Sequence, residues 1–174
     1  TLIDDPRIPY IPGSRMCDDE GVPSQRTPLI EEGVVANFLF DLQTAGQAGT
    51  FSTGSASRGL GSLPVPEVGV LQISNGEVDF PEMVADIKEG IVVEQLLGAG
   101  QSHVLSGDFN ANVLLGYKVE RGRIVGRAKN VMVSGNVYSV LRDLEAVGRD
   151  ARWVGGSLRT PSICCRGVAV ASKS

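Results

Sequence analysis

The hydrophobic pattern in the second half of the chain changes its period once, and the change separates strands from a helix. Val113, Leu115 and Tyr117 alternate with Leu114 and Gly116, and β-branched residues recur up to Val133, as in half-buried strands. Gly122 interrupts this pattern where a tight hairpin turn needs a positive φ. After Asn136, a candidate N-cap, helical spacing predicts a helix over Val137–Gly148, the longest or second-longest of the chain, with Leu141 in the core.

Shorter patterns predict the remaining elements. Further strands are expected at residues 2–6, 27–30, 34–40, 68–73 and 91–97. Gly33 supplies a hairpin turn, Pro81 suits the first turn of a helix over 81–88, and a helical turn is expected at 41–46. The Gly- and Ser-rich residues 47–61 predict an irregular loop. These elements predict an α+β fold, which is a mostly antiparallel sheet or a barrel-like domain built from hairpins, with two main helices.

Composition is that of an ordinary globular protein, with 42% hydrophobic and 21% charged residues. The 174 residues are enough for one domain with a sizeable core. No apolar run approaches the roughly 20 residues that a membrane helix needs, and the first residues lack a signal-peptide pattern, so no membrane contact is expected. Because the chain begins at Thr1, we expect it to be a fragment of a longer protein.

The charge distribution argues against a nucleic-acid surface. The net charge is −4 and the pI is about 5.0, whereas binding phosphates takes clustered Lys and Arg. The densest basic group is Lys118, Arg121, Arg123, Arg127 and Lys129. On alternating strands this group is split between two faces and interrupted by Glu120, so we interpret it as a solvated hairpin edge and expect no direct contact with nucleic acid.

Cysteine and histidine are too few and too scattered for a metal site. Cys17, Cys164 and Cys165 have neither metal-ligand spacing nor the pattern of a secreted disulfide framework, which suits reduced thiols in the cytoplasm. Cys164 and Cys165 are expected in the final strand. His103 is the single histidine, expected in a strand, whereas zinc requires several nitrogen or sulfur ligands at organised spacing. The sequence therefore predicts no metal ion in this chain.

Six short motifs, each weak alone, follow one another along the chain. They are Leu-Ile-Asp-Asp-Pro at 2–6, Cys-Asp-Asp-Glu-Gly-Val-Pro at 17–23 with Leu-Ile-Glu-Glu-Gly at 29–33, Ser-Thr-Gly at 52–54 with Arg58, Ser-Gly-Asp-Phe at 106–109, Gly-Tyr-Lys-Val-Glu-Arg-Gly-Arg-Ile at 116–124 and Ser-Gly-Asn at 134–136. In this order they resemble the C-terminal region of the PmbA/TldD family of zinc peptidases, also called the "modulator of DNA gyrase" family. The resemblance implies that residues 1–174 form the C-terminal domain of such a protein.

The resemblance also implies where zinc is held. In the catalytic branch of the family, two His of an upstream HExxxH helix and a late Cys bind zinc, and the Glu of that helix activates the metal-bound water. This chain contains no HExxxH, and it reads Trp-Val-Gly-Gly-Ser at 153–157 where Cys-Gly is expected. It therefore resembles the metal-free PmbA (TldE) branch. Zinc is expected only in a metal-bearing partner or in an upstream segment.

Two loops carry the candidate peptide-binding residues, which are Thr53, Gly54 and Arg58 in the first and Ser106, Gly107, Asp108 and Phe109 in the second. Each has a structural alternative. Asp108 could orient the amide groups of a peptide or simply cap its own turn. Arg58 could pair with a peptide carboxylate or fold over its own loop.

The resulting functional hypothesis is an assembly and peptide-holding domain without a catalytic site of its own. Strand edges can add an extended peptide by main-chain hydrogen bonds, which suits a complex that trims unfolded peptides. The expected partner is a second copy of the chain or a metal-bearing TldD-like paralogue. The alternative is a structural domain of a full-length metallopeptidase whose HExxxH helix lies upstream. A third role, in DNA topology, finds no basic stripe to support it.

Overall fold

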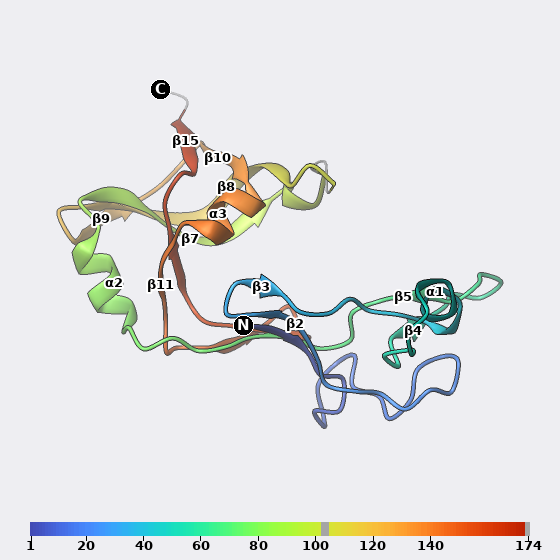
Figure 1. Ribbon diagram of the computed structural model, residues 1–174. Coiled ribbons are helices and arrows are strands. Elements are labelled where there is room, and N and C mark those ends of the chain that lie inside the picture. Colours follow the sequence, from blue (N-terminus) through green and yellow to red (C-terminus); the bar gives the residue numbers. More distant parts are fainter. Residues whose placement is uncertain (102–104, 173–174) are drawn as a thin grey trace. The chain divides into compact units, whose positions relative to one another are not determined.

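The computed structural model describes residues 1–101 and 105–172, and the chain divides into two compact units (Figure 1). Unit 1 consists of Thr1–Asn75 and Ala151–Pro161, and unit 2 consists of Gly76–Asp150 and Ser162–Ser174. The chain therefore passes between the units three times. The strand position expected for His103 lies outside the described residues.

Unit 1 is built on a six-stranded sheet with the order β12-β13-β6-β1-β2-β3. Its strands are β1 Leu2–Asp4, β2 Thr27–Glu31, β3 Val34–Val35, β6 Leu71–Ile73, β12 Arg152–Val154 and β13 Leu158–Thr160. All pairings are antiparallel except that of β13 with β6. The unit also contains helix α1 Leu42–Ala48 and a two-stranded ribbon of β4 Ala56–Ser57 and β5 Val65–Pro66.

Unit 2 contains a five-stranded antiparallel sheet with the order β15-β10-β8-β7, in which β9 also pairs with β8. Its strands are β7 Glu89–Leu97, β8 Asp108–Glu120, β9 Arg123–Arg127, β10 Val131–Asn136 and β15 Ala169–Ser172. A separate antiparallel pair consists of β11 Leu144–Val147 and β14 Ile163–Cys165. The helices are α2 Phe80–Asp86, α3 Val137–Arg142 and the 3₁₀ turn Ala99–Gln101.

The two units bury different kinds of side chain. One face of the unit 2 sheet carries an apolar cluster of Ala111, Val113, Ala128, Val131 and Val133. From β8, Ala111 and Val113 belong to this face and Phe109 packs against it, which is the alternation of a half-buried strand. In unit 1 the buried apolar residues are few, and buried polar residues accompany them: Asp4, Asp18, Ser24, Thr27, Asp41 and Ser55. Unit 1 is thus organised around hydrogen-bonded polar groups as much as around an apolar core.

Most of the expected local structure is confirmed. The fold is α+β with mostly antiparallel strands, and the hairpin between β8 and β9 turns at Gly122, whose φ is +74°. This turn lies against the end of α2, where the Gly122 N–H donates to the Ile87 carbonyl at 2.8 Å (Figure 1). Both larger sheets are open and have edge strands, such as β3 and β12 in unit 1. Of the two predicted architectures, the antiparallel sheet is therefore confirmed and the barrel-like domain is not.

The predicted helix Val137–Gly148 is wrong in its second half. Asn136 does cap a helix, but α3 ends at Arg142, is shorter than α1 and α2 and buries none of its residues. Leu141 is 49% exposed and does not lie in the core. The following residues form β11 because they pair with β14, and this long-range pairing outweighs the helical spacing of the local sequence.

The expected place of the cysteine pair is confirmed only in part. Cys164 and Cys165 lie in a strand, but it is β14 and not the last strand of the chain, which is β15. In the described part of the chain, no helix is long and apolar enough to cross a lipid bilayer.

Candidate functional site

The acidic turn at residues 17–23 supports the loop that carries the first group of candidate residues. Asp18 is buried, and its Oδ1 accepts hydrogen bonds from the backbone N–H groups of Glu20 at 3.0 Å and Val22 at 2.9 Å. Its Oδ2 accepts from the N–H of Ala56 in β4 at 3.0 Å. One carboxylate thus closes its own turn and fixes a strand that lies 38 residues later in the sequence.

The two neighbouring carboxylates act in the same way. Asp19 Oδ2 accepts from the N–H of Arg58 at 2.9 Å, and Glu20 Oε2 accepts from the N–H of Leu42 at 2.7 Å. Leu42 is the first residue of α1, where backbone N–H groups have no partner within the helix. The acidic turn therefore binds backbone amides of the loop and of α1, which explains why three acidic residues occur together.

Thr53 and Gly54 fix the shape of this loop. The Thr53 hydroxyl accepts from the N–H of Phe40 at 2.8 Å and lies 2.9 Å from the Ser55 hydroxyl, while the Thr53 N–H donates to the Phe40 carbonyl at 3.0 Å. Gly54 has a φ of +66°, and a Cβ on it would lie 2.3 Å from the Pro23 carbonyl oxygen. Both residues are required by the loop itself.

Arg58 differs from the other two residues of its group. Its backbone N–H is held by Asp19, but its side chain is exposed, and its guanidinium makes no hydrogen bond or ion pair within residues 1–101 and 105–172. A guanidinium presents a planar set of donors that matches a carboxylate. Of the first group, Arg58 is thus the side chain that is available to a ligand.

Asn136 holds the second group of candidate residues together. It pairs with Asp108 across β10 and β8, and its Nδ2 donates to the Ser106 carbonyl at 2.8 Å and to Asp108 Oδ1 at 2.9 Å. Its Oδ1 accepts from the N–H groups of Tyr138 at 3.0 Å and Ser139 at 3.4 Å at the start of α3. One side chain therefore joins the 106–109 turn to the helix.

Gly107 and Phe109 complete this corner. Gly107 is buried with a φ of +75°, and a Cβ on it would lie 2.5 Å from the ring of Tyr138. Its carbonyl accepts from the N–H of Val137 at 2.8 Å. Phe109 is half-buried and packs against the apolar cluster of unit 2. Only Ser106 and Asp108 of this group are exposed.

The seven candidate residues belong to two separate loops. Thr53, Gly54 and Arg58 lie in unit 1, whereas Ser106, Gly107, Asp108 and Phe109 lie in unit 2. Sequence reasoning missed the supporting residues of both loops. For the first loop, the run Asp-Asp-Glu-Gly at 18–21 could have indicated them, since short acidic side chains before a glycine favour turns and backbone capping.

The described residues do not fit a zinc site. Among residues 1–101 and 105–172, no three His, Cys, Asp or Glu side chains are grouped so as to hold a metal ion. Cys164 Sγ lies 3.9 Å from Glu145 Oε2, and burial, followed by the charge of Glu145, raises the pKa of the Cys164 thiol. In the metal-free chain the raised pKa makes this thiol a weaker nucleophile, since the thiolate is the reactive form.

The basic hairpin is solvent-exposed, as interpreted from the sequence. Lys118 and Glu120 form an ion pair of 2.5 Å on the surface. The side chains of Arg121, Arg123 and Arg127 are exposed as well. A wide surface hollow next to this pair is lined by residues of the hairpin alone, and neither candidate loop contributes to it. An exposed ion pair of this kind contributes little to stability.

Comparison with known proteins places the chain among peptidase-related proteins. A metalloprotease of Methanothermobacter thermautotrophicus is 33% identical over 152 residues, which are 87% of this chain and 33% of that protein. A metalloprotease TldD homolog of Haemophilus influenzae is 31% identical over 148 residues, which are 84% of this chain and 30% of that protein. The chain thus spans about a third of the length of these curated relatives.

The structural and family comparisons agree. The crystal structure of TldE from Thermococcus kodakarensis has a TM-score of 0.87 at 30% identity, and the match covers 99% of this chain and 39% of that one. The family model of the PmbA/TldA metallopeptidase C-terminal domain matches residues 1–172. The chain therefore belongs to the PmbA/TldA metallopeptidase C-terminal domain family.

Proposed function

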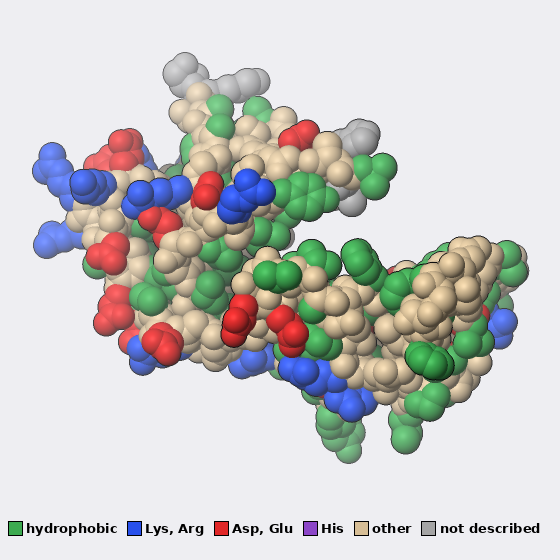
Figure 2. Space-filling view, viewed as in Figure 1, with side chains coloured by type: hydrophobic (Ala, Val, Ile, Leu, Met, Phe, Trp, Pro, Cys, Tyr) green, Lys and Arg blue, Asp and Glu red, His purple; other side chains and the backbone are tan. Residues whose placement is uncertain are grey.

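We propose that this chain is an assembly and peptide-holding domain of a TldD/PmbA-type metallopeptidase system that processes peptides. The main support is the surface of unit 1. Large apolar side chains around α1 and the neighbouring loops are exposed, among them Phe38, Leu42, Phe51, Leu60 and Leu63. Figure 2 shows hydrophobic side chains on the surface of the molecule. Phe51 is 90% exposed. Exposed apolar groups of this size and number are typical of a surface that is covered by another protein.

The interior of unit 1 supports the same proposal. Asp4, Asp18 and Asp41 are each 5% exposed or less, while the large apolar residues of α1 and its loops remain outside. Burial of those residues by a partner adds the apolar contact that unit 1 lacks by itself. The proposed partner is a second copy of the chain or a metal-bearing TldD-like paralogue.

The peptide-holding part of the proposal rests on the strand edges and on Arg58. Strands β3 and β12 lie at the two edges of the unit 1 sheet, where main-chain groups on one side have no neighbouring strand among the described residues. An extended peptide can pair with such an edge through its backbone, which requires no fixed sequence. Arg58 offers a guanidinium to a carboxylate of that peptide. Unfolded peptides are therefore the proposed substrate class.

Catalysis is assigned to another part of the system. Zinc polarises a peptide carbonyl and activates water, and the ligands for it are proposed to lie in the metal-bearing partner or in an upstream segment. The three cysteines are free thiols, with Cys17 exposed, which suits the cytoplasm that we propose for the system.

The experiment mixes the full-length protein with its metal-bearing relative and follows both complex formation and cleavage of a disordered peptide. Arg58→Ala is expected to reduce cleavage, Arg58→Lys to retain part of it, and Arg123→Ala, an exposed arginine of the basic hairpin, to have no effect. Phe51→Ser is expected to weaken complex formation. If Arg58→Ala and Asp108→Ala leave assembly and cleavage unchanged, both residues are loop scaffolding.

One observation favours the alternative, a purely structural domain of a metallopeptidase with an upstream HExxxH helix. Thr53, Gly54, Gly107 and Phe109 are all occupied in shaping their own loops. Determining the sequence upstream of residue 1 distinguishes the two functions. An upstream HExxxH supports the structural domain, and its absence supports the metal-free partner.

A further inference from the structure

Unit 1 encloses polar atoms that have no hydrogen-bond partner within residues 1–101 and 105–172. They are Asp4 Oδ2, Arg15 Nε, Arg15 Nη2 and Ser24 Oγ. Asp4 is completely buried, and Ser24 is 8% exposed. Buried polar groups in folded proteins are almost always hydrogen-bonded, because an unpaired one loses its hydration without compensation. Four such atoms in one unit therefore require an explanation.

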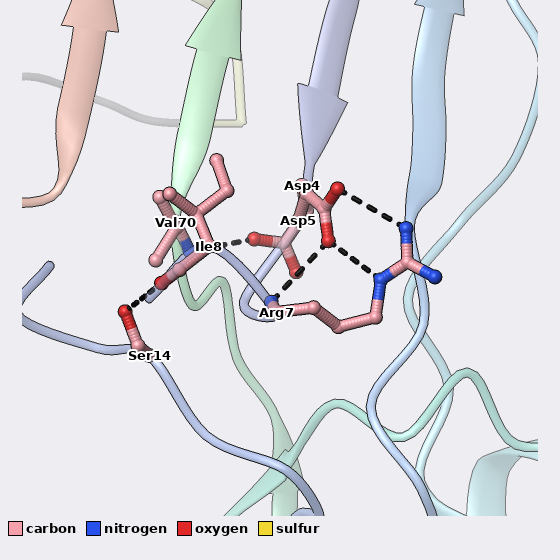
Figure 3. Close-up of polar contacts among 6 residues, drawn as sticks. All are labelled: Asp4, Asp5, Arg7, Ile8, Ser14 and Val70. Atoms are coloured by element: carbon pink, nitrogen blue, oxygen red, sulfur yellow. Dashed lines mark hydrogen bonds and ion pairs between the residues drawn. The ribbon is translucent and has the colours of Figure 1, made fainter. Parts of the chain in front are cut away.

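Each of the two charged residues is held from one side only. Asp4 Oδ1 accepts from the N–H groups of Gly69 at 3.0 Å and Val70 at 2.8 Å, and Figure 3 shows the bond to Val70. Arg15 Nη1 donates to the carbonyl of Ala56 at 3.1 Å. Both side chains are thus held in place, and each has further buried polar atoms without a partner among the described residues.

The backbone brings the segments of these residues together. The N–H of Arg15 donates to the Pro6 carbonyl at 2.8 Å, which places Arg15 next to the end of β1. The N–H of Ser24 donates to the Met16 carbonyl at 3.0 Å, one residue beyond Arg15. Burial raises the pKa of Asp4, and the charge of Arg15 acts in the opposite direction, as expected for neighbouring groups.

The chemistry of these atoms defines what can bind them. Asp4 Oδ2 needs a donor, the two nitrogens of Arg15 need an acceptor, and the Ser24 hydroxyl can serve as either. The opposite charges of Asp4 and Arg15 disfavour both an anion and a cation. Burial excludes a large ligand. A water molecule both donates and accepts, and a buried water needs two to four polar partners.

We propose that Asp4, Arg15 and Ser24 form an internal hydration site that holds one ordered water molecule. The water donates to Asp4 Oδ2, accepts from Nε or Nη2 of Arg15 and completes its shell with the Ser24 hydroxyl. Because Arg15 also binds the carbonyl of Ala56, this water links β1 to the loop that ends at Arg58. The water then helps to hold the candidate peptide-binding loop in position.

The direct test is a crystal structure of the full chain at a resolution that shows ordered water. A water is expected at hydrogen-bond distance, about 2.7–3.2 Å, from both Asp4 Oδ2 and a nitrogen of Arg15. A direct contact between Asp4 Oδ2 and Arg15, or no water density between them, overturns the proposal. This test uses the unaltered protein and does not depend on whether a variant folds.

A thermal-unfolding cycle tests the same site in solution. Asp4→Asn and Ser24→Ala are expected to be coupled, so that the double variant loses less in Tm than the two single losses together. Ser55→Ala is the control, since this serine is also buried but its hydroxyl lies 2.9 Å from that of Thr53. Combined with Asp4→Asn, it is expected to give additive losses. Additive losses for Asp4 and Ser24 contradict a shared water.

Discussion

Replacing Asn136 by Ala removes several hydrogen bonds at once. Its Oδ1 caps α3, and its Nδ2 donates to the Ser106 carbonyl and to Asp108 Oδ1. These bonds hold the end of β10, the start of α3 and the 106–109 turn together. Asn136→Ala is therefore expected to destabilise unit 2 more than the loss of an ordinary helix cap does.

The magnitude follows from the individual contacts. Loss of an N-cap costs about 1 kcal/mol, and each amide hydrogen bond contributes about 1 kcal/mol. The hydrogen bond to the Asp108 carboxylate is given the same value as a bond between neutral groups, about 1 kcal/mol, because this carboxylate is exposed and water screens its charge. Since the contacts share one residue, we expect a combined loss of about 2–3 kcal/mol. For a chain of this size, that lowers Tm by about 4–12 °C.

The assay is urea unfolding followed by far-UV circular dichroism, with two comparison variants. Asn136→Ser keeps a capping oxygen but lacks the amide donors, so its loss is expected to be about half that of Asn136→Ala. Asn112→Ala, at an exposed position of β8, is expected to change stability by less than about 0.5 kcal/mol. A loss for Asn136→Ala as small as that of Asn112→Ala refutes the reasoning.

Three further predictions concern other parts of the molecule. Gly54→Ala is expected to lower the free energy of unfolding in urea by at least about 2 kcal/mol, because φ is positive and a carbonyl oxygen lies 2.3 Å from the new Cβ. Gly21→Ala is the control and is expected to cost less, because Gly21 also has a positive φ but no atom lies within 4 Å of its new Cβ. With the other cysteines replaced by Ser, Glu145→Gln is expected to speed alkylation of Cys164, because removing this charge lowers the thiol pKa. Burial raises the pKa of Asp4 above its ordinary value of 3.8, so the native state binds the proton of this carboxyl group more tightly than the unfolded state does. The free energy of unfolding therefore falls as pH rises from 3.8 through the raised pKa. In urea unfolding, Asp4→Asn is expected to show a smaller fall over this pH range.

Features that depend on neighbouring residues were predictable from the sequence. The β8–β9 hairpin needed only alternating residues and Gly122, and the start of α3 needed only the capping side chain of Asn136. The end of α3 was not predictable in this way. Leu144 and Val147 have helical spacing, but they pair with Cys165 and Ile163, and no local pattern contains that pairing.

The candidate site was predictable in its motifs but not in their connections. The sequence indicates that Ser-Gly-Asp-Phe at 106–109 and Ser-Gly-Asn at 134–136 are turns, but not that Asn136 binds one to the other. It likewise does not indicate that Asp19 holds the backbone of Arg58, 39 residues away. Such connections are made by the tertiary fold, and they explain why turn motifs far apart in the sequence occur together.

The division of the chain into interrupted units has a consequence for its synthesis on the ribosome. Strand β6 ends at Ile73, but its parallel partner β13 begins only at Leu158, after most of unit 2 has been made. At a synthesis rate of about 5–20 residues per second, one edge of β6 has no partner strand for several seconds. Chains that stop before Leu158 keep an unpaired edge and are expected to aggregate, so the unit 1 sheet is completed late in synthesis.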